Sequence, residues 1–203
     1  MMPTWLTERP VTTRGSRLAR ALLTALGWEL SYSGLPAKQG VFLVYPHTSN
    51  WDFPIGITAK WALGLEVKFW GKDSLFRVPL FGAWLRWLGG VPVDRSAPNG
   101  LVGAIVEGVT QARARDELLW LVVTPEGTRS WQPYWKSGFY QVAQQARIPV
   151  ALVALDFGRK RIAVDHFFEL TGDRELDLAQ IEAYYQGVTG KRPALAGPIR
   201  FKP

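Results

Sequence analysis

The sequence predicts a single α/β domain with a mostly parallel mixed β-sheet flanked by helices. Short apolar runs alternate with stretches of helical periodicity, and the runs end in turns rich in Gly and Pro. The last two runs, 150–157 and 162–168, are joined only by the turn 158–160, which predicts a hairpin and hence an antiparallel edge. The chain has 203 residues, which is enough for one domain with a sizeable core.

The first element is predicted to be an amphipathic helix over 18–30. Leucines recur there at helical spacing, at Leu18, Leu22, Leu23, Leu26 and Leu30. Such a helix either packs on its own domain or lies in a membrane interface, and the sequence gives both interpretations similar weight. We take 1–32 as this N-terminal segment, 33–190 as the core of the domain, and 191–203 as a basic tail that is partly loose.

The first half of the core alternates strand and helix. Residues 41–45 are an apolar run, as expected of a buried strand, and a helix is expected over 54–63, where Pro occupies the first turn. A second strand is predicted at 66–70. Over 77–88, large apolar residues repeat every three or four positions, which predicts a helix that ends at a Gly-Gly pair.

The second half continues the alternation. A short extended piece at 91–93 precedes a helix over 99–115, and the apolar run 118–123 predicts the next strand. A helix over 138–147 leads into the hairpin strands. The last predicted helix covers 175–186.

Composition limits the possible chemistry. The chain has no cysteine, which excludes a thiol nucleophile, a disulfide framework and a Cys-based zinc site. Its formal charge of +7 favours anionic partners: nucleic acid, acidic carrier proteins, phosphorylated substrates or anionic lipid. No apolar stretch reaches the roughly 20 residues that a bilayer-spanning helix needs.

The strongest functional signal is the pair His47 and Asp52, which directly follows the strand 41–45. Ligands of parallel sheets bind beyond the carboxyl ends of the strands, so this loop is predicted to lie in the active site. A carboxylate that holds one imidazole nitrogen lets the other accept a proton from a hydroxyl. The competing interpretation, compatible with the first, is that Asp52 or Asn50 caps the next helix. The other histidine, His166, lies in a strand pattern and is expected to be structural.

A second polar cluster, 125–130, follows the strand 118–123 and is predicted to lie at the same edge. Arg129 offers a planar fork for a phosphate, and Gly127 lets the backbone come close to a ligand. Lys72 and Arg95 also follow predicted strands. Each cation alone is more often a solvated surface charge, but their position near His47 favours anion binding.

Taken together, these segments resemble the glycerolipid acyltransferases. Four ordered blocks carry the resemblance: His47-x4-Asp52, Gly90-Val91-Pro92-Val93-Asp94-Arg95, Pro125-Glu126-Gly127-Thr128-Arg129-Ser130 and Ile148-Pro149-Val150. It extends to Lys136-x-Gly138 and covers about residues 41–155. It implies a fold like that of the glycerol-3-phosphate acyltransferases. The implied reaction moves an acyl group from acyl-CoA or acyl-carrier protein to a lysophospholipid hydroxyl, with 1-acylglycerol-3-phosphate giving phosphatidic acid.

The resemblance also assigns roles. His47 would deprotonate the acceptor hydroxyl and Asp52 would orient the imidazole. A second group would bind the acceptor or shape its site: Lys72, Arg95, Glu126, Gly127, Thr128 and Arg129. Neither a metal nor a cofactor is implied beyond the acyl thioester, which is a co-substrate. The expected location is the cytoplasmic face of a membrane, as a peripheral protein held on an anionic surface.

Three alternatives remain at this stage. The acceptor could be another lysolipid or alcohol, or the same two residues could act on water in a hydrolase. The third alternative, from another class, is a basic module that binds nucleic acid or an anionic membrane. Its nucleic-acid form is disfavoured because Lys and Arg do not cluster in one helix and no RNA-binding aromatic signature is present.

Overall fold

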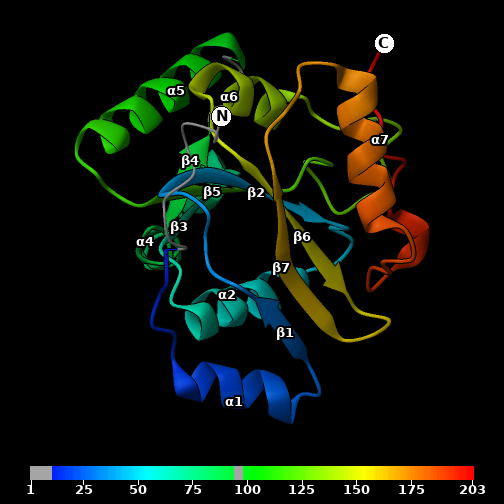
Figure 1. Ribbon diagram of the computed structural model, residues 1–203. Coiled ribbons are helices and arrows are strands. Elements are labelled where there is room, and N and C mark those ends of the chain that lie inside the picture. Colours follow the sequence, from blue (N-terminus) through cyan, green and yellow to red (C-terminus); the bar gives the residue numbers. More distant parts are fainter. Residues whose placement is uncertain (1–10, 94–97) are drawn as a thin grey trace.

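The computed structural model describes residues 11–93 and 98–203, and it confirms the predicted α/β class. Within these residues, seven strands form one sheet in the order β1-β7-β6-β2-β5-β3-β4 (Figure 1). Neighbouring strands are parallel except β6 and β7, which form the predicted antiparallel hairpin. The strands are β1 Glu29–Tyr32, β2 Gln39–Tyr45, β3 Val67–Lys72, β4 Gly90–Val93, β5 Leu119–Val123, β6 Val150–Asp156 and β7 Arg161–Phe168.

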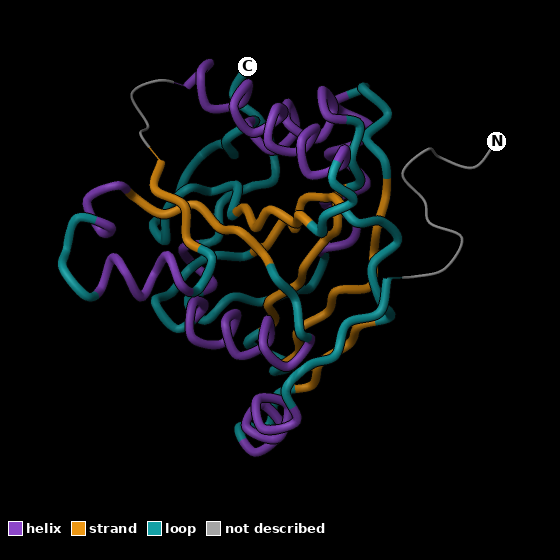
Figure 2. Tube along the Cα trace, turned by 90° about the vertical axis from the view of Figure 1, so that its left-hand side faces the viewer, coloured by secondary structure: helices purple, strands orange, loops and turns teal. Residues whose placement is uncertain are grey.

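Helices cover both faces of the sheet, which makes three layers (Figures 1 and 2). The helices α1 and α2 lie on one face, and α5, α6 and α7 lie on the other. The described helices are α1 Arg17–Ala25, α2 Asp52–Leu63, α3 Asp73–Phe76, α4 Phe81–Trp87, α5 Pro98–Ala114, α6 Gly138–Ala146, α7 Arg174–Tyr185 and the 3-10 turn Pro193–Leu195.

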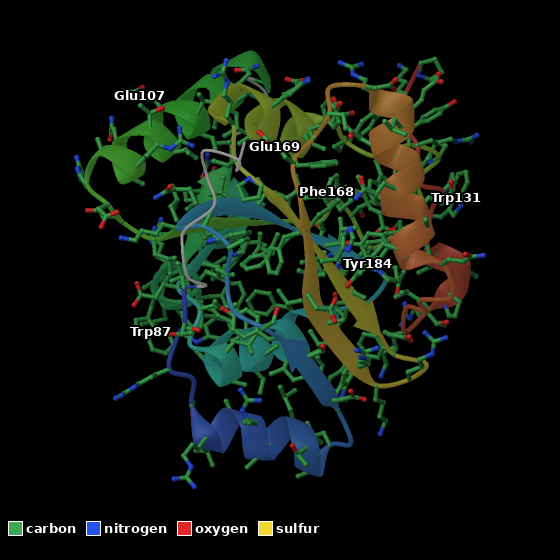
Figure 3. All side chains as sticks on the ribbon, in the orientation of Figure 1. Trp87, Glu107, Trp131, Phe168, Glu169 and Tyr184 are labelled. Atoms are coloured by element: carbon green, nitrogen blue, oxygen red, sulfur yellow. The ribbon has the colours of Figure 1, made fainter. Side chains whose placement is uncertain are left out.

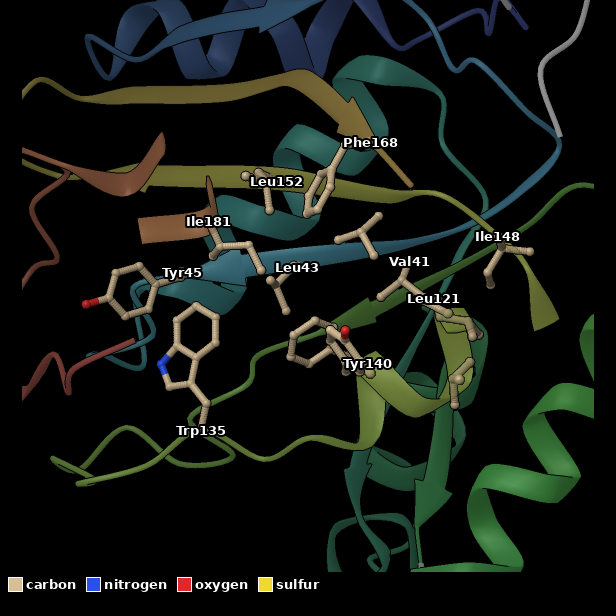
Figure 4. Close-up of a cluster of buried hydrophobic side chains, with 14 of the residues drawn as sticks. Val41, Leu43, Tyr45, Leu121, Trp135, Tyr140, Ile148, Leu152, Phe168 and Ile181 are labelled. Carbon is tan, nitrogen blue, oxygen red and sulfur yellow. The ribbon is translucent and has the colours of Figure 1, made fainter. Parts of the chain in front are cut away.

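The central strand β2 contributes to the core on both sides. Because side chains alternate along a strand, Val41 and Leu43 face α6 and α7, whereas Phe42 faces α1 and α2. All three are buried, as expected for a strand covered on both faces. Figure 4 shows the first of these clusters, in which the Tyr45 and Trp135 rings lie beside each other at 5.2 Å.

The predicted helix over 18–30 is wrong at its C-terminal end. The helix α1 stops at Ala25, and Gly27 adopts a φ of +78°, a conformation that reverses the chain at low steric cost only for glycine. Residues 29–32 then form β1, which pairs in parallel with β7. Only one leucine of the predicted stripe within α1 is buried, namely Leu23. Leu18, Leu22 and Leu26 face solvent.

The predicted helix over 77–88 is also shorter. Residues 77–80 are not helical and only α4, Phe81–Trp87, remains of it, while the short α3 ends before it at Phe76. Leu80 has a φ of +60°, so the helical path cannot run through it. No described helix is both long enough and apolar enough to span a bilayer.

The tail does not match the expectation of a partly loose segment. We call residues 190–203 the C-terminal strap, because they run along the edge of the sheet that carries the His47 loop. The Tyr45 hydroxyl donates to the Gly197 carbonyl at 3.0 Å, and Trp135 pairs with the strap through the Trp135 N–H and the Arg200 carbonyl. Pro and basic residues in a short tail predict looseness, but these long-range contacts hold the strap in place.

Candidate active site

His47 and Asp52 lie at the carboxyl end of β2, as predicted. The loop 46–51 leaves the strand and turns into α2, whose first residue is Asp52. This turn brings the Asp52 Oδ2 to 3.0 Å from the His47 Nδ1. Because a carboxylate can only accept, Nδ1 donates this hydrogen bond and Nε2 is left with the lone pair. The pair therefore has the arrangement of a general base held by a carboxylate.

Asp52 does not act as the cap of α2. The N-cap position is Trp51, and no side chain caps it. The Asp52 carboxylate instead accepts a second hydrogen bond from the Ser49 N–H at 2.8 Å, which fixes the carboxylate within the loop. Its other oxygen, Oδ1, is buried without a hydrogen-bond partner in the part of the chain that the structure describes. An unsatisfied buried oxygen disfavours folding, so we interpret Asp52 as placed for His47 rather than for stability.

Glu126 lies beneath the His47 loop and is almost fully buried, with 1% of its surface exposed. The loops after β2 and β5 are neighbours because these two strands pair in parallel. The Glu126 carboxylate accepts from the His47 backbone N–H at 2.6 Å and from the Gly197 N–H at 3.5 Å. Glu126 thus joins both loops to the C-terminal strap, a bracing role that sequence reasoning did not foresee.

Burial raises the pKa of Glu126 to about 7. The hydrogen bonds from His47 and Gly197 oppose this rise because they favour the charged form, whereas the negative charge of Asp52 adds to it. Loss of solvation is the largest of these effects. The brace consequently contains a carboxyl group that titrates near neutral pH.

The rest of this loop faces outward. Gly127 has a φ of +69°, which closes the turn that starts at Thr124, and it lines the cavity described below. The Thr128 hydroxyl accepts a hydrogen bond from the Ser130 N–H at 3.4 Å, so it shapes the loop. Arg129 is exposed and lies outside the described lining of the cavity.

Two predicted anion-binding side chains cannot be placed. Arg95 and the side chain of Lys72 lie outside the described residues. The backbone of Lys72 ends β3, in register with Val93 at the end of β4. The proposed roles of both cations stay predictions.

His47 opens onto a cavity of about 710 Å³. On the side of α1 and α2 its lining is mostly apolar and includes Phe42, Val44, Phe53, Ile57, Leu63, Ile162 and Val164. Gly56 on α2 also lines it and faces open space, since a methyl group added there would meet nothing within 4 Å. Past His47 the cavity reaches Gly127 and Lys136, where the lining becomes more polar.

Sequence analysis did not assign two features near His47 to the site. Lys136 lines the cavity beside Gly127, and the Lys136-x-Gly138 match was the only signal for it. The contacts of the C-terminal strap with the His47 loop were not predicted. The Arg192 N–H donates to the Thr48 hydroxyl at 3.2 Å, and the Lys191 ammonium lies 5.0 Å from the centre of the Trp51 ring.

The other histidine does not belong to this site. His166 lies on β7, where its ring packs 5.2 Å from the Tyr184 ring and its Nε2 is 3.4 Å from the Gln180 amide. Across residues 11–93 and 98–203, no group of three or more His, Cys, Asp or Glu side chains is placed to hold a metal ion.

Comparisons with known proteins point to one family. The sequence model of the acyltransferase family matches residues 30–156. Over 132 residues the chain is 29% identical to the 1-acyl-sn-glycerol-3-phosphate acyltransferase of Saccharomyces cerevisiae, a match that covers 59% of this chain and 39% of that protein. The chain thus spans well under half the length of this relative.

A solved structure has the same fold. The 1-acyl-sn-glycerophosphate (LPA) acyltransferase PlsC from Thermotoga maritima superposes with a TM-score of 0.53, over 84% of this chain and 75% of that one. The two sequences are 18% identical, so the likeness concerns the fold. The region matched by the family model contains both His47 and Glu126.

Proposed function

Because the chain belongs to the acyltransferase family, we propose that it moves a fatty acyl group from acyl-CoA or acyl-carrier protein to a lysophospholipid hydroxyl. The acceptor that we propose is 1-acylglycerol-3-phosphate, which would give phosphatidic acid. One observation carries this proposal: a His47–Asp52 pair at 3.0 Å faces an apolar cavity large enough for a lipid chain. The acid–base pair supports transfer to a hydroxyl, and the cavity supports a lipid substrate.

The proposed step needs no covalent intermediate on the protein. The His47 Nε2 removes the proton from the acceptor hydroxyl while the oxygen attacks the thioester carbonyl carbon. The C–O bond forms, the C–S bond breaks, and the imidazolium returns its proton to the leaving thiolate. Asp52 stabilises the imidazolium through Nδ1. A single general base of this kind typically contributes about 10²–10⁴ in rate.

The apolar part of the cavity is proposed to hold an acyl chain. Its walls come from β2, α2 and β7, and the polar end at Lys136 and Gly127 lies past His47. An acyl chain in the apolar part would place its carboxyl carbon near the imidazole. Gly56 leaves room in the wall, so a larger side chain at this position would shorten the space for the chain.

The acceptor phosphate is proposed to bind at the polar end. Lys136 lines the cavity there, and Arg129 is exposed on the loop that Gly127 belongs to. Lys72 and Arg95 remain candidates from the neighbouring strand ends. An ammonium and a guanidinium suit a phosphate monoester, because both donate charge-assisted hydrogen bonds.

We also propose that the protein works as a peripheral protein on an anionic membrane, on its cytoplasmic face. Leu18 and Leu22 on α1 and Leu26 at its C-cap are exposed and spaced four residues apart, and Arg14 and Arg17 are exposed in the same segment. Basic residues near an anionic surface are attracted by about 1 kcal/mol each. The net charge of +7 supports the same location.

The test is product analysis by mass spectrometry. Purified protein is offered a panel of lysolipids together with acyl-CoA or acyl-carrier protein, and His47→Ala serves as the control. We expect a new diacyl product from 1-acylglycerol-3-phosphate that the variant does not form. Free fatty acid in place of the diacyl lipid would make the protein a hydrolase, and transfer to a different acceptor would correct the substrate. No turnover of any donor would refute the proposal.

A further inference from the structure

A second group of exposed apolar side chains lies on α3, α4 and the residues around them. Of the large apolar side chains that are exposed in the described residues, seven lie between positions 75 and 91: Leu75, Val78, Leu80, Phe81, Trp84, Trp87 and Val91. We call them the α4 apolar face. Figure 3 shows Trp87 at the edge of the molecule that carries α4. A soluble monomer rarely exposes so many large apolar groups in one segment, so we expect a binding partner to cover this face.

Two details show that the exposure is built into the fold. The Leu80 side chain is 87% exposed and sits on a backbone with a φ of +60°, a conformation that disfavours a branched residue such as leucine. Trp87 is 72% exposed, and its ring contacts that of Trp61 on α2 at 6.2 Å. Most of the apolar surface of both side chains faces water.

The charge around the face identifies the partner. Residues 74–93 contain Arg77 and Arg86 and no acidic residue. Asp73 and Asp94 flank them in the sequence, and the Asp73 carboxylate is paired with Arg77. Tryptophan with basic residues is typical of the headgroup layer of a bilayer, and cations are attracted to anionic lipid. A second copy of this chain would bring the same positive charge against itself. An anionic phospholipid bilayer therefore fits better than self-association.

The α4 apolar face is also connected to the active-site cavity. The Trp84 ring lies 6.1 Å from the Phe53 ring, and Phe53 in turn lies 5.5 Å from Phe69. Both phenylalanines line the cavity, and Phe53 directly follows Asp52 in the chain. A row of aromatic rings thus leads from the surface to the catalytic pair.

We propose that the α4 apolar face inserts into an anionic phospholipid bilayer and that lipid substrate passes from the bilayer into the cavity beside Phe53. This inference rests on the proposed function, because it assumes a lipid substrate. It adds a second membrane contact to that of α1, at the entrance to the cavity. Lipid would then reach His47 without crossing bulk water.

The main test compares two matched double variants. Leu80→Ser with Trp87→Ser removes the two most exposed members of the face. Leu176→Ser with Trp131→Ser removes an exposed leucine and an exposed tryptophan elsewhere. We expect the first double variant to bind phosphatidylglycerol vesicles about tenfold or more weakly than wild type, whereas the second binds them like wild type. Equal binding by wild type and the first variant would overturn the proposal.

Activity separates this inference from the proposed function. The first double variant should lose activity on acceptor embedded in vesicles and keep wild-type activity on short-chain substrates dissolved below their micelle concentration. A wild type that is inactive on both substrates would refute the proposed function, and the vesicle-binding comparison would still decide the inference. A variant that loses binding to acyl-carrier protein, with vesicle binding unchanged, would make the face a protein-docking surface and overturn the proposal.

Labelling gives a second measurement on an intact face. The chain has no cysteine, so Leu80→Cys and Leu176→Cys can each carry one environment-sensitive fluorophore. Anionic vesicles should shift the emission of the label at position 80 to the blue and leave the label at position 176 unchanged. A label at position 80 that stays in water on membrane-bound protein would contradict insertion.

Discussion

The two loops of the site differ in how firmly the fold holds them. The His47 loop is braced: Thr48 and Ser49 are nearly inaccessible, and this loop is hydrogen-bonded to Glu126, Asp52 and Arg192. On the other loop, Arg129 is exposed. The half that we propose transfers the proton is therefore organised before any substrate arrives, whereas a long cation must lose rotamer freedom when it binds. Substitutions in the first half should change kcat, and those in the second should change KM.

The largest effect is expected from His47→Ala. Without the base, kcat should fall by about 10³-fold. The fold should persist, because the braces of the loop run through the His47 backbone N–H and not through its ring. Steady-state kinetics together with thermal unfolding would check both parts. A variant with near-normal kcat would show that the imidazole is not the base.

Glu126→Gln tests whether the brace itself titrates. The pKa of Glu126 in the folded protein, about 7, lies above the usual 4.5, so the unfolded chain loses its proton first as pH rises. Protonation of Glu126 therefore stabilises the folded state fully below pH 4.5, and this stabilisation is lost by about pH 7. The loss in the free energy of unfolding is on the order of 3 kcal/mol. Glutamine cannot titrate, so the variant should lack this decline.

Urea unfolding at pH 5 and pH 8 would measure the effect on the free energy of unfolding. Glu126 should make the free energy of unfolding of the wild type larger at pH 5 than at pH 8. The difference in this free energy between the two pH values should be smaller in Glu126→Gln. Glu175→Gln, on the exposed first turn of α7, is a suitable control. The same pH dependence in wild type and Glu126→Gln would mean that Glu126 does not titrate in this range.

Asp52→Asn keeps the shape of the side chain that accepts from the His47 Nδ1 and removes its charge. The amide can donate to Nδ1 and so favour the wrong tautomer, and it cannot stabilise the imidazolium. We expect kcat to fall by about 10²-fold, with the acceptor KM little changed. Kinetics over a range of acceptor concentrations would separate the two. A change in KM alone would mean that Asp52 contacts substrate.

The smallest effect is expected from Arg129→Ala, in the exposed half. Loss of one charge-assisted hydrogen bond in a solvated position should raise the acceptor KM by about tenfold and leave kcat nearly unchanged. Arg159→Ala, which removes an exposed arginine paired with Asp156 near the hairpin turn, is a matched control. If kcat fell instead, the contrast between a rigid half and a flexible half would not hold.

The sequence predicted the parts of the molecule whose signals are local. Apolar runs identified β2 and β5, and the polar residues that follow them identified the two loops, because a strand and its loop are adjacent in the chain. His47 and Asp52 are five residues apart, so one turn was enough to bring them together. The position of Glu126 next to them followed from parallel pairing, but its burial under His47 did not.

The features that the sequence did not predict depend mostly on contacts between residues that are distant in sequence. Residues 29–32 show no clear strand pattern, and they become β1 because β7, some 130 residues later, offers its free edge. Gly197 reaches Glu126 across 71 residues, and no motif marks a strap glycine as part of a catalytic site. The direction of the Arg129 side chain could not be predicted from the sequence either, since exposed arginines have many rotamers of similar energy.

The contact between Gly197 and Glu126 also has a consequence for biosynthesis. The brace beneath His47 needs a backbone amide that is made 150 residues after the imidazole. On a translating ribosome, the strands from β1 to β7 are all synthesised before residue 197. The support under the base therefore cannot be complete before that residue has left the ribosome.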